Sequence, residues 1–210
     1  MVVLSGPSHA EEVARGIPTA VVAASGDRVS AELVQNLFMN SRLRIYTSPD
    51  VVGVEISAAM KNVIALCAGC IDGMGLGDNT KAMLITRGLT EIARLGVAMG
   101  ARKETFAGLA GVGDLIVTCT SVHSRNNRAG RLIGQGVPVE HAVTGMDGAV
   151  VEGYYAAASA CELAQKAGVE MPVTTGAYAV LYQKEDPHIV LNRLMTREKK
   201  DELETEESWI

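Results

Sequence analysis

The stretch SRNNRAGR gathers three arginines, two asparagines and a serine at the start of an expected helix. If Ser124 caps that helix, free backbone N–H groups and the positive end of the helix dipole face outward there. Arg125 and Asn126 would add side-chain donors, and a guanidinium fits phosphate oxygens in bidentate fashion. The cluster is therefore either a seat for an anion or a solvated basic face, and for Arg128 and Arg131 the second interpretation stays open.

Three further polar residues lie in apolar surroundings. Lys61, in EISAAMKNVIALCAG, has small apolar neighbours three and four positions away. It either snorkels to water or lies in a partly desolvated cleft, where a lysine can exchange protons near neutral pH. Asp114 and Thr118 share one face of an apolar segment, which predicts a hydrogen-bonded polar spot, although Asp114 could serve only as a partner of the helix dipole. His9 and His123 have no carboxylate at a suggestive spacing, so we interpret them as structural or surface residues.

The cysteines predict neither a disulfide scaffold nor a metal site. Cys67 and Cys70 form a C-x-x-C inside a helical pattern, whereas a redox motif normally follows a strand and opens a helix. The other two cysteines, Cys119 and Cys161, add no second C-x-x-C pair, so no metal ligand set is expected. We interpret all four as small, mostly buried thiols in a reducing cytoplasm.

The composition excludes several classes of function. The formal net charge is −5, which gives no general attraction for nucleic acid or for an anionic membrane surface. No uninterrupted apolar run of about 18 residues is present, so no stable membrane insertion is expected. The chain does not open on a basic-then-apolar signal peptide.

The elements that must position these residues fall into two parts. Over residues 1–49 the order is strand, helix, strand, helix, strand, which is typical of an α/β layer but too short for a complete doubly wound domain. Ser8 and Glu11 are spaced as a capping box for the first helix. The second helix, DRVSAELVQNLFMNS, has an apolar face expected to be buried (Leu33, Val34, Leu37 and Phe38).

From Asp50 onward the pattern is almost entirely helical. The expected helices cover residues 50–77, 80–100, 104–119, 124–135, 153–168 and 174–183. Residues 197–210 are expected to form a charged, exposed tail. We therefore predict three regions, 1–49, 50–196 and 197–210. Neither GMGLG nor GLAGVG has the spacing and the preceding strand of a dinucleotide fingerprint, so most of any nicotinamide site is expected to lie outside this chain.

Four motifs together resemble the bacterial NAD(P)-dependent glycerol-3-phosphate dehydrogenase family. They are LSGPSHAEEVARGIPTAVVAAS, VEISAAMKNVIALCAGCIDGMGLGDNTKAMLITRGL, GLAGVGDLIVTCTSVHSRN and VVEGYYAA, in the family's order. The resemblance implies a mainly α fold. An all-helical substrate domain, similar to the C-terminal domain of 6-phosphogluconate dehydrogenase, would follow a βαβαβ remnant of a Rossmann domain that lacks the fingerprint-bearing start.

The resemblance also assigns roles to single residues. Lys61 matches the catalytic lysine that exchanges a proton with the substrate oxygen, and Asn62 would be a supporting polar group. Matches to substrate-binding positions are Gly6, Ser8, Lys61, Asp114, Thr118, Ser124, Arg125 and Asn126. Matches to cofactor-binding positions are Ala10, Arg125, Val150 and Glu152. The approach to the last of these positions, MDGAVVEG, is longer than is usual in the family.

The implied activity is an oxidoreductase reaction that interconverts dihydroxyacetone phosphate and sn-glycerol 3-phosphate with NAD or NADP and supplies glycerophospholipid biosynthesis. The isolated chain would have little activity, and a homodimer is expected. Two other functions stay open, namely a non-catalytic helical module for binding or dimerisation and a related β-hydroxyacid-type dehydrogenase. Reduction of dihydroxyacetone phosphate that is lost on replacing Lys61 would favour the glycerol-3-phosphate dehydrogenase activity over these two alternatives.

Overall fold

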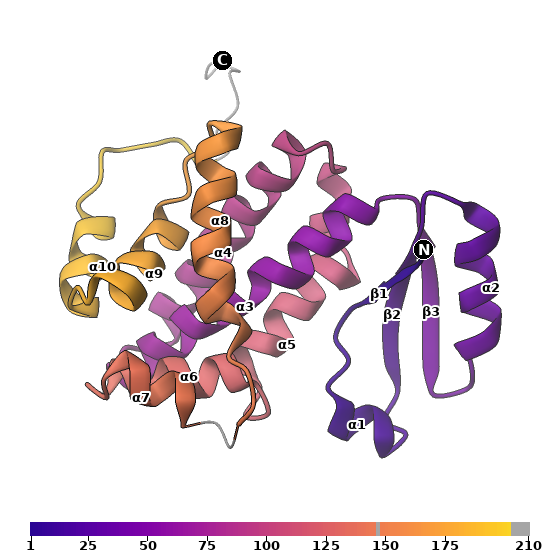
Figure 1. The fold of residues 1–210 in the computed structure, drawn as a ribbon, viewed down its shortest axis with the longest axis horizontal. Coiled ribbons are helices and arrows are strands. Elements are labelled where there is room, and N and C mark those ends of the chain that lie inside the picture. The colour runs from indigo at the N-terminus through magenta and orange to yellow at the C-terminus, as the bar shows by residue number, and fades with distance from the viewer. Residues whose placement is uncertain (146–147, 203–210) are drawn as a thin grey trace.

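The computed structural model of the protein describes residues 1–145 and 148–202. Figure 1 shows a small sheet with its two helices beside a larger body made of helices. This arrangement confirms the predicted fold class, a helical body preceded by a short strand-and-helix part. The last eight residues of the predicted charged tail, 203–210, lie outside the described residues.

The sheet has the strand order β1-β2-β3, with β1 at Val3–Ser5, β2 at Thr19–Ala24 and β3 at Leu43–Ser48. Strands β2 and β3 are parallel, whereas β1 is antiparallel to β2. The β2–β3 connection contains α2 (Arg28–Phe38), whose eleven residues carry the chain back along the sheet. The β1–β2 connection contains only α1 (Ala10–Ala14), whose five residues span about 7.5 Å and make no such crossover.

The predicted burial of one α2 face is wrong in part. Val34 packs against the small core formed by β2 and β3. Leu33 and Leu37, however, are 57% and 68% exposed, and Phe38 is also more than half exposed. Within the described residues only one side of α2 meets the sheet, so the outer half of its apolar surface faces solvent.

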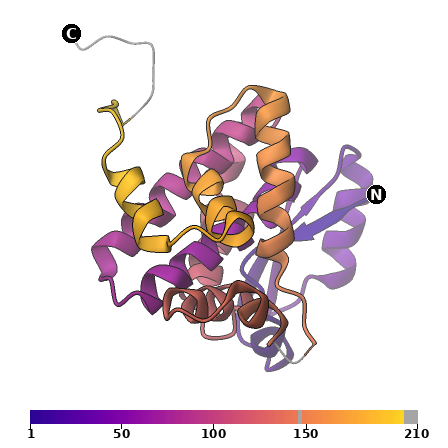
Figure 2. The same cartoon turned by 60° about the vertical axis from the view of Figure 1, so that its left-hand side comes forward.

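The helical body contains α3 (Val51–Gly73), α4 (Asp78–Ala98), α5 (Asp114–Thr120), α6 (Arg125–Gly134), α7 (Val139–Thr144), α8 (Glu152–Ala167), α9 (Pro172–Gln183) and α10 (Pro187–Met195). Figures 1 and 2 show α3 running through the body, with α9 and α10 at the end far from the sheet. The sequence pattern did not indicate α7 or α10, although Asp186 and Pro187 form a recognisable cap for α10.

The predicted helix over residues 104–119 is wrong in its first half. The chain there forms a 3-10 helix, η1 (Lys103–Ala107), and a π-helical turn, η2 (Leu109–Gly113), before α5 begins. Inside η2, Gly111 has φ −91° and ψ −105°, which no helix contains. A Cβ at Gly111 would lie 2.2 Å from the Phe106 carbonyl oxygen, so only glycine lets the chain pass this point.

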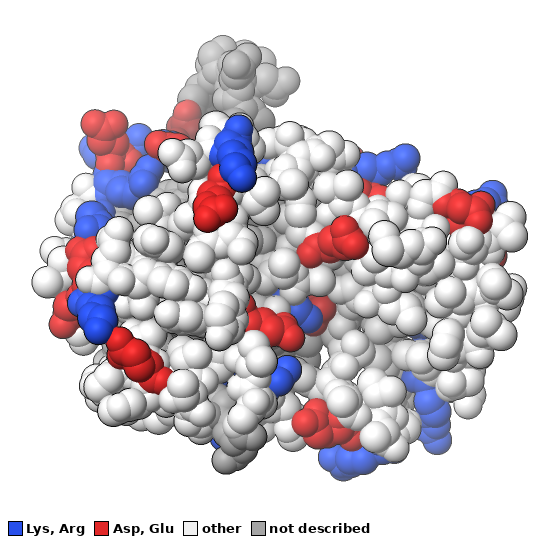
Figure 3. All heavy atoms as spheres, in the orientation of Figure 1, with Lys and Arg blue, Asp and Glu red and all other residues white. Residues whose placement is uncertain are grey.

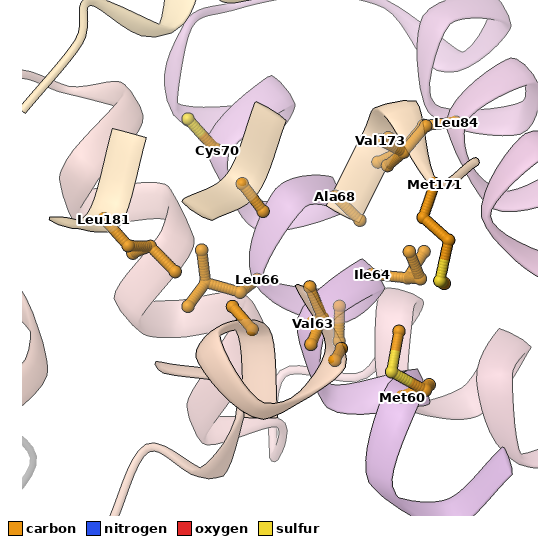
Figure 4. Close-up of a cluster of buried hydrophobic side chains, with 14 of the residues drawn as sticks. Met60, Val63, Ile64, Leu66, Ala68, Cys70, Leu84, Met171, Val173 and Leu181 are labelled. Atoms are coloured by element: carbon orange, nitrogen blue, oxygen red, sulfur yellow. The ribbon is translucent and has the colours of Figure 1, made fainter. Parts of the chain in front are cut away.

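Helix α3 is the centre of the core. By length and composition it could cross a membrane, and it is the only such helix among the described residues. It packs against α4, α5, α6 and α8, and Val63 and Ile64 are fully buried. Figure 4 shows its apolar side chains among those of the surrounding helices. These contacts are those of the central helix of a folded core.

Helices α3 and α6 approach each other through glycines. A Cβ at Gly69 would lie 1.9 Å from the Asn127 carbonyl oxygen, and one at Gly130 would lie 1.9 Å from the Leu66 carbonyl oxygen. Such close backbone contact excludes any side chain at these positions. The approach sets the α6 N-terminus beside the part of α3 that carries Lys61.

Candidate active site

Lys61 and Asp114 form an ion pair that joins α3 to the first residue of α5. The Lys61 Nζ atom lies 2.6 Å from Asp114 Oδ2. The Asp114 side chain is 3% exposed and that of Lys61 is 21% exposed. The carboxylate is therefore buried, while the amine keeps partial access to solvent, so Lys61 is not a freely snorkelling surface lysine.

Thr118 completes the polar spot that its spacing from Asp114 predicts. Its hydroxyl lies 2.6 Å from the Asp114 carbonyl oxygen and 3.3 Å from Asp114 Oδ1. Both residues are buried on α5. The two carboxylate oxygens of Asp114 therefore have different partners, Lys61 on one and Thr118 on the other, which fixes the orientation of the carboxylate.

A chain of hydrogen bonds joins α3, α6 and the start of α8 beside Lys61. The Gly153 N–H donates to Asn126 Oδ1 at 2.8 Å, and Asn126 Nδ2 donates to Asn62 Oδ1 at 3.0 Å. Asn62 Nδ2 then donates to Glu152 Oε2 at 2.9 Å. Asn62 and Asn126 are buried, and their satisfied amides hold the three helices in register.

The N-terminus of α6 has the predicted cap. Ser124 Oγ accepts a hydrogen bond from the Asn127 N–H at 3.2 Å. The Arg125 side chain is 47% exposed and faces Glu152, with Nη2 and Oε1 4.0 Å apart. This contact is long, so the guanidinium and the helix terminus can together receive an anion.

The other two arginines of the cluster do not join this anion seat. Arg128 is exposed. Arg131 lies one turn further along α6, and its Nη2 is 3.2 Å from Asp72 Oδ2 of α3. The cluster is therefore divided, with Arg125 at the helix start and Arg131 in an ion pair between two helices.

One pocket between the sheet-bearing part and the helical body collects most of the predicted site residues. All predicted substrate contacts line it, namely Gly6, Ser8, Lys61, Asp114, Thr118, Ser124, Arg125 and Asn126. Asn62 and Glu152 line it as well, whereas Ala10 and Val150 are exposed outside it. Figure 3 shows charged side chains within the hollow between the two parts, and intermixed acidic and basic side chains elsewhere on this face.

Ser8 lies in the pocket but does not cap α1 as predicted. His9 occupies the N-cap position of α1, and no side chain caps this helix. The Ser8 hydroxyl instead donates to the Gly6 carbonyl oxygen at 3.0 Å, which explains why it is not used at the helix start. The capping box with Glu11 is therefore not formed.

The structure also brings His9 and His123 to this pocket, where the sequence pattern indicated only structural or surface roles. Their ring centroids are 5.9 Å apart. No spacing rule joins two residues from such distant loops. The signal that was available is their adjacency to predicted substrate contacts, because His9 follows Ser8 and His123 precedes Ser124.

The thiols do not contribute nucleophiles. All four cysteines are free, and Cys70 and Cys119 are buried. Burial raises the pKa of both thiols to about 12, so they stay protonated and inert near neutral pH. Among the residues that the structure describes, no group of three or more His, Cys, Asp or Glu side chains could hold a metal ion.

The fold and the pocket define a class: a helical domain attached to a short strand-and-helix part, with a polar pocket between them. The family model described as NAD-dependent glycerol-3-phosphate dehydrogenase C-terminus matches residues 50–192, and the corresponding N-terminus model matches residues 1–31. The chain belongs to the NAD-dependent glycerol-3-phosphate dehydrogenase family.

Individual relatives agree with this assignment. The chain is 57% identical to a glycerol-3-phosphate dehydrogenase [NAD(P)+] of Clostridium botulinum, over 97% of this chain and 61% of that protein. It is 59% identical to the protein of the same name from Pelotomaculum thermopropionicum, over 97% of this chain and 58% of that protein. The chain thus spans about three fifths of the length of the curated relatives it matches.

Solved structures show the same fold. The glycerol-3-phosphate dehydrogenase of Coxiella burnetii superposes with a TM-score of 0.91 at 42% identity, covering 94% of this chain and 60% of that one. The yeast glycerol-3-phosphate dehydrogenase superposes with a TM-score of 0.80 at 28% identity, covering 90% of this chain and 57% of that one.

Proposed function

We propose that the protein interconverts dihydroxyacetone phosphate and sn-glycerol 3-phosphate with NAD or NADP, and so supplies glycerophospholipid synthesis. The observation that carries this proposal is the Lys61–Asp114 pair, which lines the same pocket as the N-terminus of α6. The pair offers a proton donor, and the helix terminus with Arg125 offers a seat for a phosphate. A three-carbon phosphate fits such a pocket, because its carbonyl can meet the proton donor while its phosphate group lies at the helix terminus.

Proton transfer is the task of Lys61. A nicotinamide cofactor, when bound, supplies a hydride to the carbonyl carbon or accepts one from the alcohol. As the carbonyl oxygen gains negative charge, the Lys61 ammonium stabilises it and donates a proton to it. In the reverse direction the neutral amine accepts the proton of the alcohol. Asp114 orients the amine, Thr118 holds the Asp114 carboxylate, and Asn62 connects α3 to α6 and α8 beside Lys61.

The phosphate end of the substrate is assigned to the start of α6. Ser124, Arg125 and Asn126 would supply backbone and side-chain donors, and a charge-assisted hydrogen bond contributes about 1.5–3 kcal/mol. Gly6 and Ser8, in the loop after β1, would cover the bound substrate on the side of the pocket that faces the sheet. Gly6 has φ +148°, and a Cβ there would lie 2.9 Å from the Val21 Cα, so this loop position requires glycine.

The edge of the pocket has side chains suited to a dinucleotide. Arg125 and Glu152 are about half exposed, and they offer a guanidinium for phosphate and a carboxylate for hydroxyl groups. Ala10 and Val150 are exposed, and each lies within two positions of a pocket-lining residue in the sequence. The small side chain of Ala10 and the apolar side chain of Val150 leave room for a flat ring. This donor set fits one edge of NAD or NADP, and these four residues are the ones we assign to it.

The same proposal includes the regions, the location and the assembly of the protein. Residues 1–49 would belong to the dinucleotide-binding domain, 50–196 to the substrate domain and 197–210 to a charged tail. Free thiols suit a reducing cytoplasm. A homodimer is supported by exposed apolar side chains such as Tyr155 and Ile189, which are each 60% exposed. Light scattering after size-exclusion chromatography would test the dimer.

The decisive experiment compares substrates and two variants. Reduction of dihydroxyacetone phosphate would be followed by the loss of reduced-nicotinamide absorbance, with dihydroxyacetone as the substrate that lacks phosphate. We expect turnover of the phosphorylated substrate alone. Lys61→Ala should lower this turnover about 10³-fold, and Arg125→Ala should raise the KM for dihydroxyacetone phosphate. Binding of glycerol 3-phosphate without any turnover in the full-length protein would instead favour a non-catalytic module. A preference for a non-phosphorylated hydroxy acid would favour the related dehydrogenase class.

A further inference from the structure

Two histidines line the proposed active site without a role in the reaction described above. His9 comes from the loop between β1 and α1, and His123 directly precedes the cap of α6. Their rings are tilted by 56°, with centroids 5.9 Å apart. The Nε2 atom of His9 is buried and has no hydrogen-bond partner among the described residues. A buried nitrogen without a partner is rare in folded proteins, so a ligand is a natural candidate for its partner.

The charges around these rings are balanced. Lys61 of α3 pairs with Asp114 of α5, and Arg125 of α6 faces Glu152 of α8. Two cations and two anions give a formal charge of zero while both histidines are neutral. With both imidazoles protonated, the charge of the pocket becomes +2. The protonation of the two histidines therefore decides how strongly this pocket attracts an anion.

The acidic residues nearest in sequence do not alter this balance inside the pocket. Glu11 and Glu12 lie in the first turn of α1, directly after His9, and neither lines the pocket. His141 of α7 and His188 of α10 also lie outside it. His9 and His123 are thus the two histidines that line the pocket together with Ser124 and Arg125.

We propose that His9 and His123 are additional ligands of the substrate phosphate, one from each part of the molecule, beside Arg125. The proposal rests on the proposed function, because it takes the phosphate to be bound at the start of α6. Each imidazole donates a hydrogen bond to a phosphate oxygen, which supplies the acceptor that His9 Nε2 lacks. A phosphate held in this way also ties the β1–α1 loop to the helical body.

The proposal predicts a dependence of affinity on pH. An imidazole ordinarily titrates near pH 6.5, and the second ionisation of a phosphate monoester lies near pH 6. Between about pH 8 and about pH 6.5 an ordinary imidazole gains charge, while much of a phosphate monoester keeps two negative charges. The affinity for a phosphorylated ligand therefore rises as the pH falls through this window. Arg125 stays charged throughout, so its contribution does not change.

The test measures binding of glycerol 3-phosphate to the 210-residue chain by calorimetry at both ends of this window. The variants are His9→Gln and His123→Gln, which keep a side-chain amide donor, with Arg125→Ala as reference and His188→Gln as the matched control. We expect each pocket histidine variant to weaken binding about tenfold near pH 6.5 and less than about threefold near pH 8. Arg125→Ala should weaken binding by the same factor at both values, and His188→Gln should have no effect.

Other outcomes separate this inference from the proposed function. An equal loss at both pH values would show that the two rings only join the two parts of the molecule, and no loss at either would also overturn the proposal. If the wild-type chain and Arg125→Ala bind glycerol 3-phosphate equally, or neither binds it, the proposed function fails as well. The ring proton resonances give an independent readout, since only those of His9 and His123 should shift when glycerol 3-phosphate is added.

Discussion

Two lysine–aspartate pairs flank the α3–α6 helix pair, one toward each end, and they have nearly the same geometry. The Nζ–O distance is 2.6 Å between Lys61 and Asp114 and 2.5 Å between Lys81 and Asp72. Each lysine side chain is 21% exposed. The geometry of an ion pair therefore does not by itself identify a lysine that takes part in a reaction.

The surroundings of the two acids are different. Asp72 lies between two cations, because Arg131 contacts its second oxygen at 3.2 Å, and it connects α3 to α4 and to α6. Asp114 has one cation, one hydroxyl donor and a more deeply buried side chain, and its lysine lines a pocket. The first pair holds helices together, whereas the second keeps an oriented amine beside a site for a substrate.

The largest expected effect separates the two lysines. Lys61→Ala should lower the turnover of dihydroxyacetone phosphate about 10³-fold, because the positioned proton donor is lost. Lys81→Ala removes an ion pair whose lysine is equally exposed but lies outside the pocket, so turnover should stay within about twofold of the wild type. Steady-state kinetics of both variants would measure this difference. Comparable losses of turnover in the two variants would contradict the distinction between the two lysine–aspartate pairs.

The next effect separates the two acids. Asp114→Asn keeps the shape of the side chain but removes the charge that orients Lys61, and we expect turnover to fall about 10- to 100-fold. Asp72→Asn leaves the pocket intact, so its turnover should match that of the wild type. Thermal unfolding of both variants is the necessary control. A loss of turnover in Asp114→Asn that merely follows a loss of folded protein would argue for a structural role.

The helical part of the fold could be predicted because its signals are local. Long runs of small and apolar residues with a helical pattern indicate α3 and α4, and Ser124 marks the start of α6. The segment before α5 could not be predicted, because Gly111 takes a backbone conformation set by its contact with the Phe106 carbonyl group. The antiparallel β1 could not be predicted either, since strand direction depends on pairing across the sheet.

The candidate site was predictable where a residue has a local signature. The spacing of Asp114 and Thr118 indicates their shared polar face, and the cluster at Arg125 indicates an anion seat. The pairing of Lys61 with Asp114 is a contact between helices, and the resemblance, not the spacing, placed them together. The approach of His9 to His123 has no local signature, since it depends on how the sheet-bearing part sits against the helical body.

A smaller effect is expected from the glycine contact between α3 and α6, the two helices that both lysine–aspartate pairs flank. In Gly130→Ala the new Cβ would meet the Leu66 carbonyl oxygen at 1.9 Å, so α3 and α6 must separate. Overpacking of this kind should lower the free energy of unfolding by about 1–3 kcal/mol. Gly26→Ala, where a Cβ meets nothing within 4 Å, is the matched control. Urea unfolding curves that coincide for the two variants would show that the helices tolerate separation.

The smallest effect concerns a third aspartate, at the start of α3, which accepts hydrogen bonds where Asp72 and Asp114 pair with lysines. Asp50 caps α3, and its side chain accepts hydrogen bonds from the Gly53 N–H at 3.0 Å, the Arg102 N–H at 2.9 Å and the Thr105 hydroxyl. Burial alone would raise the pKa of Asp50, but the bonds from Thr105, Gly53 and Arg102 outweigh it and hold the pKa below its ordinary value of 3.8. An ionised Asp50 therefore stabilises the fold mainly through these hydrogen bonds, with a smaller contribution from the charge of Arg102.

Because the folded state lowers this pKa, the stabilisation by Asp50 is fully present above the ordinary pKa of 3.8 and is lost as the pH falls through the folded value. We expect Asp50→Asn to lower the free energy of unfolding by about 1 kcal/mol near neutral pH, the usual cost of weakening a helix cap. The difference between wild type and variant should shrink in acid, as measured by urea unfolding over a pH series. If the difference stayed constant into acid, the stabilisation would come from the shape of the cap. The ionised carboxylate would then have no part in it, in contrast to Asp72 and Asp114, whose charges pair with lysines.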